Sequence, residues 1–506
     1  MSDKIRVRFA PSPTGPLHIG GVRTALFNYL FAKKNNGDFI LRIEDTDQAR
    51  YVEGAEEYIN ESLEWLGLNP DEGVKQGGEY GPYRQSERRE LYLPLAQKLI
   101  EDGWAYYAFD TPEELDSLRN SYEAEKKTFA YDHTNRKNLN NSLNINPEEL
   151  KSRINNGEPY VIRFKMPEDK VIEVNDLVRG NIKYNTSTLD DKVIFKSDGL
   201  PTYHLANVAD DHSMKITHVI RGEEWLPSLP LHVMLYKALG WENEMPLFAH
   251  LPLILKPSGK GKLSKRDGDK EGFPVFPLEW KSPDSDVSVG FRESGYFADA
   301  VINLLAFLGW NPGTDQELFS MNELITSFEI GRVNKAGARF DPDKAKWYNQ
   351  NYLKDKPNSV LADLFIETLA EKGITQEKAY IEKVIDMVKE RASFITDIWD
   401  QASYFFSSPK EYDAKSTKKF WKEQTPGIIY DCLEIIKNAE PFTSVHTEKI
   451  IKEYTINNEL GFGKVMNPLR LAIVGAGKGV HLFDIIELIG KEETIKRIEK
   501  ALQSLS

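Results

Sequence analysis

Cysteine is almost absent from this chain of 506 residues, which contains only Cys432. One cysteine excludes a disulfide within the chain and a zinc site built from several thiolates. Long apolar runs are also missing: no stretch approaches the roughly 18 residues of a membrane-spanning helix, and the N-terminus has no signal-like apolar segment. We therefore expect a cytoplasmic protein without membrane contact, long enough for several domains.

Positive charge is in deficit, with 65 lysines and arginines against 78 acidic residues and a net charge of −13. This balance argues against loose, non-specific adhesion to nucleic acid, whose phosphates need cations. It still permits a specific nucleic-acid partner, because the field along one face decides binding. The clusters that could form such a face are Arg84 with Arg88 and Arg89, Lys260–Arg266, and Lys415–Lys422.

The N-terminal segment IRVRFAPSPTGPLHIGG has the pattern of a phosphate site. Ile5–Phe9 predicts a strand, a proline-rich loop follows, and a helix is expected from about His18 to Lys34. The first N–H groups of a helix are unpaired and its dipole is positive there, so an anion is favoured at this end. Gly20 would let the backbone approach the ligand, and His18 can donate to a phosphoryl oxygen.

A second basic motif, KPSGKGKLSKRDGDK, follows the apolar run Leu251–Leu255 far downstream. Its glycines and cations suit a mobile loop that closes over a polyphosphate and places Lys262 and Lys265 on charge that develops in a transition state. An ordinary solvated surface loop is the alternative interpretation. An early His-x-Gly with a late Lys-Leu-Ser-Lys favours the phosphate-binding interpretation.

Two halves of a doubly wound, Rossmann-like α/β domain are predicted. The first contains the strand, helix and second strand up to Ile43. The second contains strand-like runs at Val193–Phe195, Ile216–Ile220 and Leu247–Leu255 around a helix near Thr202–Ala209. Between them, a polar, asparagine-rich stretch and the strand-like runs YVIRFKMP and VIEV indicate an inserted α/β subdomain. From about residue 296 the pattern is helical, which predicts an all-α C-terminal half.

Two arginines stand at the ends of predicted strands that face one crevice. Arg8 ends the first strand and Arg221 follows Ile216–Ile220. Guanidinium groups match carboxylate geometry and stay charged, so the pair fits a ligand with two carboxylates. Glu44 follows the second strand and could bind an ammonium group in the same crevice. Surface salt bridges are the competing interpretation for each arginine alone.

Several stretches resemble those of bacterial glutamyl-tRNA synthetases, which belong to the class I aminoacyl-tRNA synthetases. They are RFAPSPTGPLHIGG, FILRIEDTD, GPYRQSERRELY, PTYHLANVADDHSMKITHVIRGEEW, LILKPSGKGKLSKRDG and the C-terminal GFGKVMNPLRLAIVGAGKGVHLFDIIELIGKEETIKRIEKAL, and the likeness covers nearly the whole chain.

The resemblance implies ATP-dependent attachment of L-glutamate to tRNA-Glu through a glutamyl-adenylate, with ATP as substrate and Mg²⁺ held mainly by ATP and water. It also implies attack by the 2′ hydroxyl of the tRNA, a need for tRNA in the first step, and a monomer.

Site residues follow by matching the same stretches. His18 and Lys265 are expected to be catalytic. The residues expected at ATP are Thr14, His18, Gly20, Glu224, Lys262 and Lys265. Those expected at glutamate are Arg8, Ala10, Ser12, Glu44, Tyr203, Asn207, Arg221 and Trp225. No metal ligand is expected: some members of the family carry a Cys-x-Cys zinc knuckle, but Ala108 and Asp110 stand at those positions, so no zinc is predicted.

The expected domain boundaries combine the composition with the resemblance. They are 1–84 and 192–257 for the two catalytic halves, 85–191 for an inserted subdomain that holds the tRNA acceptor end, 258–340 for the Lys-Leu-Ser-Lys loop and a stem-contact region, and 341–506 for a helical anticodon-binding domain.

Four other classes of protein fit these sequence features less well. A glutaminyl-tRNA synthetase has a β-barrel C-terminal half and a pocket that should not need two arginines. A truncated relative that glutamylates a tRNA base lacks the anticodon domain, and a free-standing adenylyltransferase is much shorter. A non-catalytic RNA-binding derivative should have lost His18, Lys265 or the arginines. Whether tRNA-Gln is also charged, which residues contact the anticodon and the oligomeric state stay open.

Overall fold

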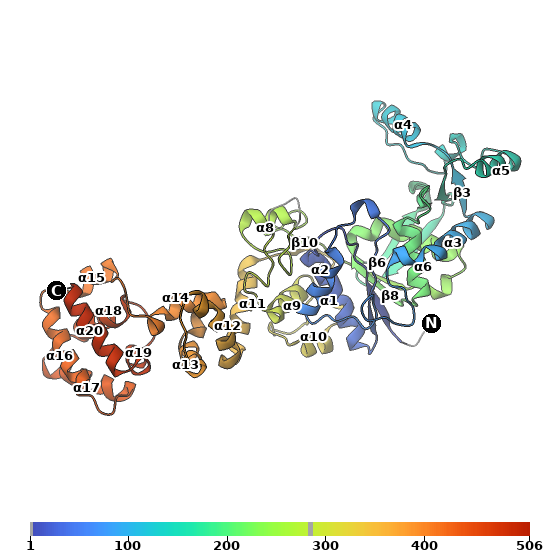
Figure 1. The fold of residues 1–506 in the computed structure, drawn as a ribbon. Coiled ribbons are helices and arrows are strands. Elements are labelled where there is room, and N and C mark those ends of the chain that lie inside the picture. The colour runs from blue at the N-terminus through green and yellow to red at the C-terminus, as the bar shows by residue number, and fades with distance from the viewer. Residues whose placement is uncertain (1–3, 282–286, 506) are drawn as a thin grey trace. The chain divides into compact units, whose positions relative to one another are not determined.

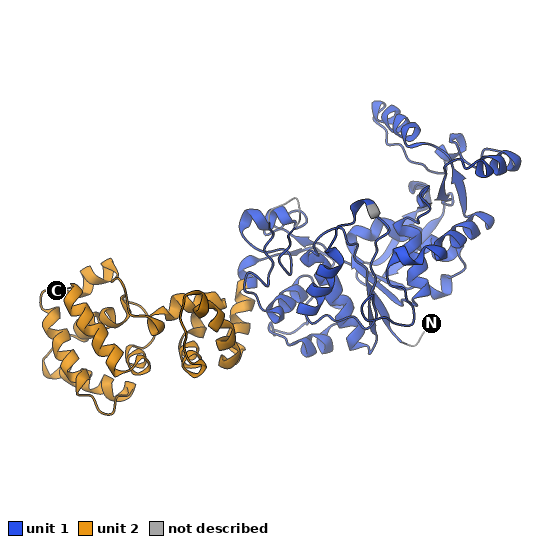
Figure 2. Cartoon of the chain, in the orientation of Figure 1, with its two compact units in different colours: residues 1–345 blue, residues 346–506 orange. Residues whose placement is uncertain are grey.

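The computed structural model describes residues 4–281 and 287–505, which form two compact units, 1–345 and 346–506 (Figure 2). The proline-bearing segment after the Lys-Leu-Ser-Lys motif, expected to form a loop or ribbon, includes 282–286, which lie outside the described residues. The strands, all in the first unit, are β1 (Arg6–Phe9), β2 (Asp38–Leu41), β3 (Ala105–Ala108), β4 (Val161–Phe164), β5 (Val171–Asp176), β6 (Gly180–Asn185), β7 (Val193–Phe195), β8 (His218–Gly222), β9 (Leu247–Leu251), β10 (Ile254–Leu255) and β11 (Ala338–Arg339).

Helices accompany these strands in the first unit and continue through the described part of the second (Figure 1). Those of the first unit are α1 (Ile19–Lys34), α2 (Ala55–Trp65), α3 (Arg89–Glu101), α4 (Pro112–Ala124), α5 (Pro147–Asn155), α6 (Tyr203–Ser213), α7 (Leu229–Ala238), α8 (Lys265–Glu271), α9 (Ala298–Phe307) and α10 (Met321–Ser327). The later ones are α11 (Pro342–Asp355), α12 (Asn358–Glu371), α13 (Lys378–Val388), α14 (Ile395–Phe406), α15 (Ala414–Phe420), α16 (Thr425–Lys437), α17 (Ser444–Asn457), α18 (Phe462–Val474), α19 (Leu482–Ile489) and α20 (Lys491–Leu505).

The main sheet of the first unit has the strand order β2-β1-β8-β9-β5-β6 among the described residues. The pairs from β2 to β5 are parallel, and β6 joins β5 as an antiparallel hairpin. From β1 the chain first adds β2 on one side and later adds β8 on the other. This reversal is the topological switch point at which doubly wound sheets open a ligand crevice, at the carboxyl ends of the strands. The predicted Rossmann-like fold is confirmed.

Strand β1 is buried along its whole length, although its sequence is RVRF. Val7 and Phe9 face one side of the sheet, where they join the apolar core. Arg6, on the opposite side, donates to Asp38 at 2.8 Å and to Glu72 at 2.6 Å. The charge of Arg6 can be buried because its guanidinium is paired with these two carboxylates.

Helix α1 begins directly after His18, whose side chain caps it. Its apolar residues pack on β1 and the neighbouring strands, and Lys33 and Lys34 stand in the last turn, where cations suit the helix dipole. Gly37 then returns the chain to β2; a Cβ atom there would lie 2.3 Å from the carbonyl oxygen of Ile5. Only glycine allows this close approach, which sets the pairing of β1 with β2.

Two strand assignments made from the sequence are wrong in their partners. The strand Val193–Phe195 (β7) pairs with β4 in a separate antiparallel sheet, β3-β4-β7, and not in the main sheet. The run VIEV, expected in the inserted subdomain, forms β5 and extends the main sheet beside β9. A local pattern specifies a strand but not its partner, and the alternating burial of β5 suits a strand with one solvated face.

The described part of the second unit is helical, as expected for the C-terminal half. Its core includes an arginine: Arg497 of α20 is buried and donates from Nη1 to the carbonyl oxygens of Tyr404 at 2.6 Å and Ile473 at 3.0 Å. None of the helices among the described residues combines the length and the apolar character needed to cross a membrane.

Candidate active site

A cavity of about 340 Å³ opens at the carboxyl edge of the main sheet. Its walls are the ends of β1 and β8, the chain after β9 and the N-terminus of α1. Most of the residues predicted for ATP and glutamate line it: Arg8, Ala10, Ser12, His18, Gly20, Glu44, Tyr203, Asn207, Arg221, Glu224, Trp225 and Lys262.

The other two predicted residues, Thr14 and Lys265, line a second cavity of about 460 Å³. His18 and Ser12 line both cavities, so the two spaces adjoin at the start of α1. Lys265 does not lie in a loop as expected, because it is the first residue of α8. Ser264 and Asp267 cap this helix, with the backbone N–H of Ser264 donating to Asp267 Oδ2 at 3.0 Å.

His18 is held as a neutral hydrogen-bond donor. Its Nδ1 accepts from the backbone N–H of Gly20 at 3.1 Å, which places the ring proton on Nε2. Burial, together with the charge of Lys262, lowers the pKa of His18 to about 4. Within the described part of the chain, the buried Nε2 has no hydrogen-bond partner. A buried donor without a partner at the wall of a cavity fits an acceptor on a ligand.

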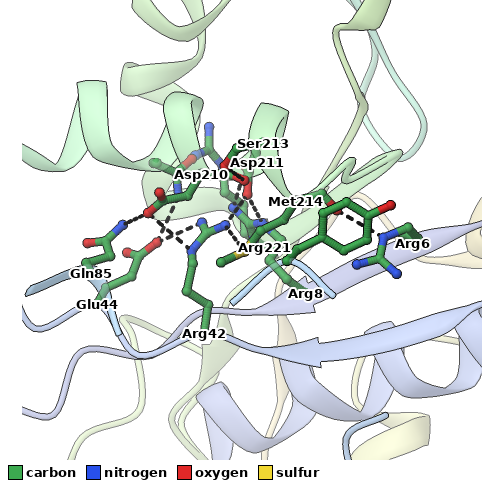
Figure 3. A network of polar contacts seen from close by, with 12 residues as sticks. Arg6, Arg8, Arg42, Glu44, Gln85, Asp210, Asp211, Ser213, Met214 and Arg221 are labelled. Atoms are coloured by element: carbon green, nitrogen blue, oxygen red, sulfur yellow. Dashed lines mark hydrogen bonds and ion pairs between the residues drawn. The ribbon is translucent and has the colours of Figure 1, made fainter. Parts of the chain in front are cut away.

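Arg8 is paired within the protein (Figure 3). Asp211 of α6 accepts from its Nε at 3.0 Å and its Nη2 at 3.2 Å, and also accepts from Arg42 Nη1 at 2.7 Å. Burial opposes ionisation of Asp211, but the two arginines lower the pKa of this carboxyl. One carboxylate therefore orients the guanidinium of Arg8 at the edge of the cavity.

Glu44 belongs to the same network. Its Oε1 accepts from Arg42 Nη2 at 3.1 Å and from Asn207 Nδ2 at 3.0 Å. Burial raises the pKa of Glu44, and the charges of Arg42 and Arg8 oppose that rise. The carboxyl is thus positioned from two sides while it lines the cavity, where a cationic group of a ligand would favour its charged form.

Arg221 has a different environment. Its Nε donates to His250 Nε2 at 3.0 Å and its Nη1 donates to Tyr203 Oη at 2.9 Å. Among the described residues it forms no ion pair with a carboxylate, although it is only 4% exposed. Tyr203 stacks on Trp225 with ring centroids 4.3 Å apart. A buried, uncompensated cation at a cavity wall fits an anionic group of a ligand.

Lys262 and Glu224 form an ion pair of 3.0 Å at the same cavity. Both side chains are about half exposed, so the pair contributes little to stability and can open when a ligand arrives. Lys262 is then available to a phosphate chain.

Asp110, at one position of the zinc knuckle found in some family members, has protein partners. It accepts hydrogen bonds from Tyr131 Oη at 2.7 Å and from the backbone N–H of Asn140 at 2.9 Å. These bonds join the end of β3 to the segment between α4 and α5.

The residues that support this site were missed in the sequence. Asp211, Arg42 and His250 contact predicted site residues but were not singled out. A signal was available for Asp211, because two adjacent acids, Asp210 and Asp211, stand in a helix that is otherwise mostly apolar on its buried side. His250, within an apolar strand, was a weaker one.

The fold and this cavity together define a class I aminoacyl-tRNA synthetase. Residues 4–347 match the family model described as "tRNA synthetases class I (E and Q), catalytic domain", and residues 360–502 match an anticodon binding domain. The chain belongs to this glutamyl and glutaminyl family of class I synthetases.

Individual relatives support the assignment along the full length. A glutamate–tRNA ligase of Flavobacterium johnsoniae is 59% identical over 505 residues, and that of Christiangramia forsetii is 57% identical over 506 residues, each match covering 100% of both chains. A crystal structure of a glutamate tRNA ligase from Elizabethkingia meningosepticum in complex with its amino acid matches with a TM-score of 0.97 at 53% identity, covering 99% of this chain and 100% of that one.

Proposed function

We propose that this enzyme attaches L-glutamate to tRNA-Glu in two steps, through a glutamyl-adenylate, and so supplies protein synthesis in the cytoplasm. One observation carries the choice of amino acid: Arg221 is buried at the cavity wall with neutral partners among the described residues. A ligand with a second carboxylate would compensate this charge, whereas an amide would leave it unpaired.

The other groups of glutamate have partners nearby. The carboxylate that does not meet Arg221 would meet Arg8, which Asp211 already orients. The ammonium group would meet Glu44, beside Asn207. Ala10, Ser12, Tyr203 and Trp225 would complete the walls of the glutamate pocket.

The nucleotide would occupy the space around the start of α1. His18 Nε2 would donate to a phosphoryl oxygen. The backbone at Gly20 is open to the ligand, because a Cβ atom added there would have only His18 Nδ1 nearby, at 3.5 Å. Lys262 and Lys265, with Thr14 and Glu224, would surround the rest of ATP. Mg²⁺ would arrive with ATP, because this hard ion keeps phosphate oxygens and waters as ligands.

The reaction then needs no covalent intermediate on the protein. A carboxylate oxygen of glutamate attacks the α-phosphorus of ATP, and pyrophosphate leaves. A ribose hydroxyl at the 3′ end of the tRNA next attacks the carbonyl carbon of the adenylate, and AMP leaves. Positioning and charge stabilisation by His18 and the lysines supply the rate enhancement.

The tRNA would extend over the remaining parts of the chain. We propose that the inserted segment 85–191 holds the acceptor end, that 258–340 contacts the stem, and that the helices of 341–506 bind the anticodon, in a monomer.

Aminoacylation with labelled glutamate and ATP tests the proposal, with purified tRNA-Glu and tRNA-Gln in parallel and labelled glutamine as the competing substrate. Charging of tRNA-Glu by glutamate is expected. Charging of tRNA-Gln as well would keep the chemistry and add a role in supplying an amidation route. Charging with glutamine, or no charging by a folded protein, would contradict the proposal.

A further inference from the structure

Asp176, His250 and Arg221 form a line across three neighbouring strands. Arg221 of β8 and His250 of β9 are register partners, and β5, which ends at Asp176, pairs with the other side of β9. His250 Nδ1 lies 2.7 Å from Asp176 Oδ2, and His250 Nε2 accepts from Arg221 Nε at 3.0 Å. All three side chains are buried.

These contacts determine the tautomer of His250. Arg221 has only N–H donors, so the Nε2 atom that faces it must be the unprotonated one. The ring proton therefore lies on Nδ1 and is donated to Asp176. Asp176 is itself anchored, because its Oδ1 accepts from the backbone N–H groups of Val178 at 2.9 Å and Arg179 at 2.8 Å.

We propose that His250 and Asp176 are positioning residues that hold the guanidinium of Arg221 toward the substrate carboxylate and leave its charge available. The inference rests on the proposed function and deepens it, since it assigns the support of glutamate selectivity to two residues outside the cavity wall. The imidazole separates two opposite charges that would otherwise pair directly.

The contrast with Arg8 supports this role. Arg8 is bound by a carboxylate on two of its nitrogens, which orients it but offsets part of its charge. The guanidinium of Arg221 is also oriented by two hydrogen bonds, to an imidazole and to a phenol. Neither of these partners carries a negative charge. His232, the other imidazole near Arg221, lies 3.4 Å away, and burial lowers its pKa, so it too is neutral. The full charge of Arg221 is therefore directed to a ligand.

Asp176→Asn tests the proposal with almost no change in shape. The oxygen of the new amide must remain on the backbone N–H groups of Val178 and Arg179, so its NH₂ group faces His250 Nδ1. His250 then has to carry its proton on Nε2, where it meets the N–H of Arg221. Two donors in contact displace the guanidinium.

Kinetics and NMR of the full-length chain give separate readouts. We expect the KM for glutamate to rise at least about tenfold in Asp176→Asn, the loss expected when a buried charged donor is misdirected, while the KM for ATP stays unchanged. In ¹⁵N spectra of histidine-labelled protein, the protonated nitrogen of His250 should change from Nδ1 to Nε2. A changed tautomer with an unchanged KM for glutamate would overturn the proposal, as would equal rises in both KM values.

Glu173→Gln is the matched control, because Glu173 lies on the same strand but is exposed and pairs with Lys183 at 2.7 Å. It should leave both KM values and the His250 tautomer unchanged. If Asp176→Asn proves unstable by its melting temperature, His250→Gln replaces it. That side chain retains an acceptor for Arg221 and a donor for Asp176, so the KM for glutamate should stay within about threefold; a tenfold rise would overturn the proposal.

The proposed function can fail separately. If the unmodified protein charges no tRNA with glutamate, that function is wrong whatever the variants do. The positioning contact is then decided by the Arg221 Nε–H signal, which Asp176→Asn should shift and Glu173→Gln should not.

Discussion

Asp211 binds the guanidinium of Arg8 through two hydrogen bonds, to Nε at 3.0 Å and to Nη2 at 3.2 Å. The two residues are 203 positions apart in the sequence, on β1 and α6, and both are buried. Arg221, the second arginine of the cavity, has instead an imidazole and a phenol as its partners. The site thus contains one arginine that shares a protein carboxylate with Arg42 and one that has no carboxylate partner among the described residues.

Asp211→Asn should destabilise the protein. The change leaves Arg8 and Arg42 buried with one fewer carboxylate, and breaking a buried pair by removing one partner costs about 3–5 kcal/mol. Urea unfolding at pH 7 measures the loss. Glu173→Gln, which removes an exposed carboxylate paired with Lys183, should have little effect. Equal midpoints for Asp211→Asn and the unmodified chain would contradict the importance of this pair.

Arg8→Gln should weaken glutamate binding far more than ATP binding. Asp211 keeps its bond to Arg42 at 2.7 Å, so the site should retain its shape while it loses one cation. We expect the KM for glutamate to rise about tenfold or more, the value of one charged hydrogen bond. Separate KM values for the two substrates test this. Equal effects on both would mean that Arg8 does not face the amino acid.

Lys265→Ala should lower turnover by about 10²-fold or more, the usual loss for one group that stabilises charge in the transition state. The affinity for glutamate should change little, because Lys265 lines the second cavity and not the one that contains Arg8 and Arg221. Lys270, exposed in the last turn of the same helix, provides the control, and Lys270→Ala should be near normal. An undiminished turnover in Lys265→Ala would remove this lysine from the mechanism.

His18 should make the stability of the protein depend on pH. Its pKa is about 4 in the folded chain against 6.5 in the unfolded chain, so between these values only the unfolded chain binds the proton. Stability from this group is complete above the unfolded pKa and falls as the pH drops toward 4. Between pH 7 and pH 5 the free energy of unfolding should fall by about 2 kcal/mol from this residue alone.

The comparison of the unmodified chain with His18→Asn isolates this effect, since the other titrating groups are common to both. Urea unfolding at pH 7 and pH 5 should show a smaller loss for the variant. Identical losses would place the His18 ring in water and not against the buried start of α1.

Local elements near the N-terminus were predictable. The strand at Ile5–Phe9 and the helix from His18 to Lys34 correspond to β1 and α1, because alternation, prolines and a capping residue act over a few neighbouring positions. Gly309 follows the C-cap of α9 with a φ of 107°, and a glycine directly after an apolar helical run is a common helix stop. The strand Val193–Phe195 was assigned to the wrong sheet, because strand pairing depends on partners far along the chain.

For the site, too, features set by local sequence were predictable and contacts between distant residues were not. Arg8, Glu44 and Arg221 were expected to share one crevice, and they line one cavity because parallel strands bring their carboxyl ends to one edge. Lys265 was expected in a loop, since its glycines and charges outweighed the Ser-x-x-Asp cap that starts α8. Asp211 was missed, because an acid within a helix is ordinarily solvated and its ion pair joins distant elements.

The amino-acid sequence by itself determined the family, the order of strands and helices around the phosphate motif, and which residue types could meet ATP and a dicarboxylic amino acid. These depend on motifs and periodicity, which are local. Only the tertiary structure decided that Arg8 is paired with Asp211, that Arg221 contacts the imidazole of His250 and not a carboxylate, and that His18 presents its Nε2 proton. Those properties depend on burial and on contacts between residues far apart in sequence, which set charge, tautomer and pKa.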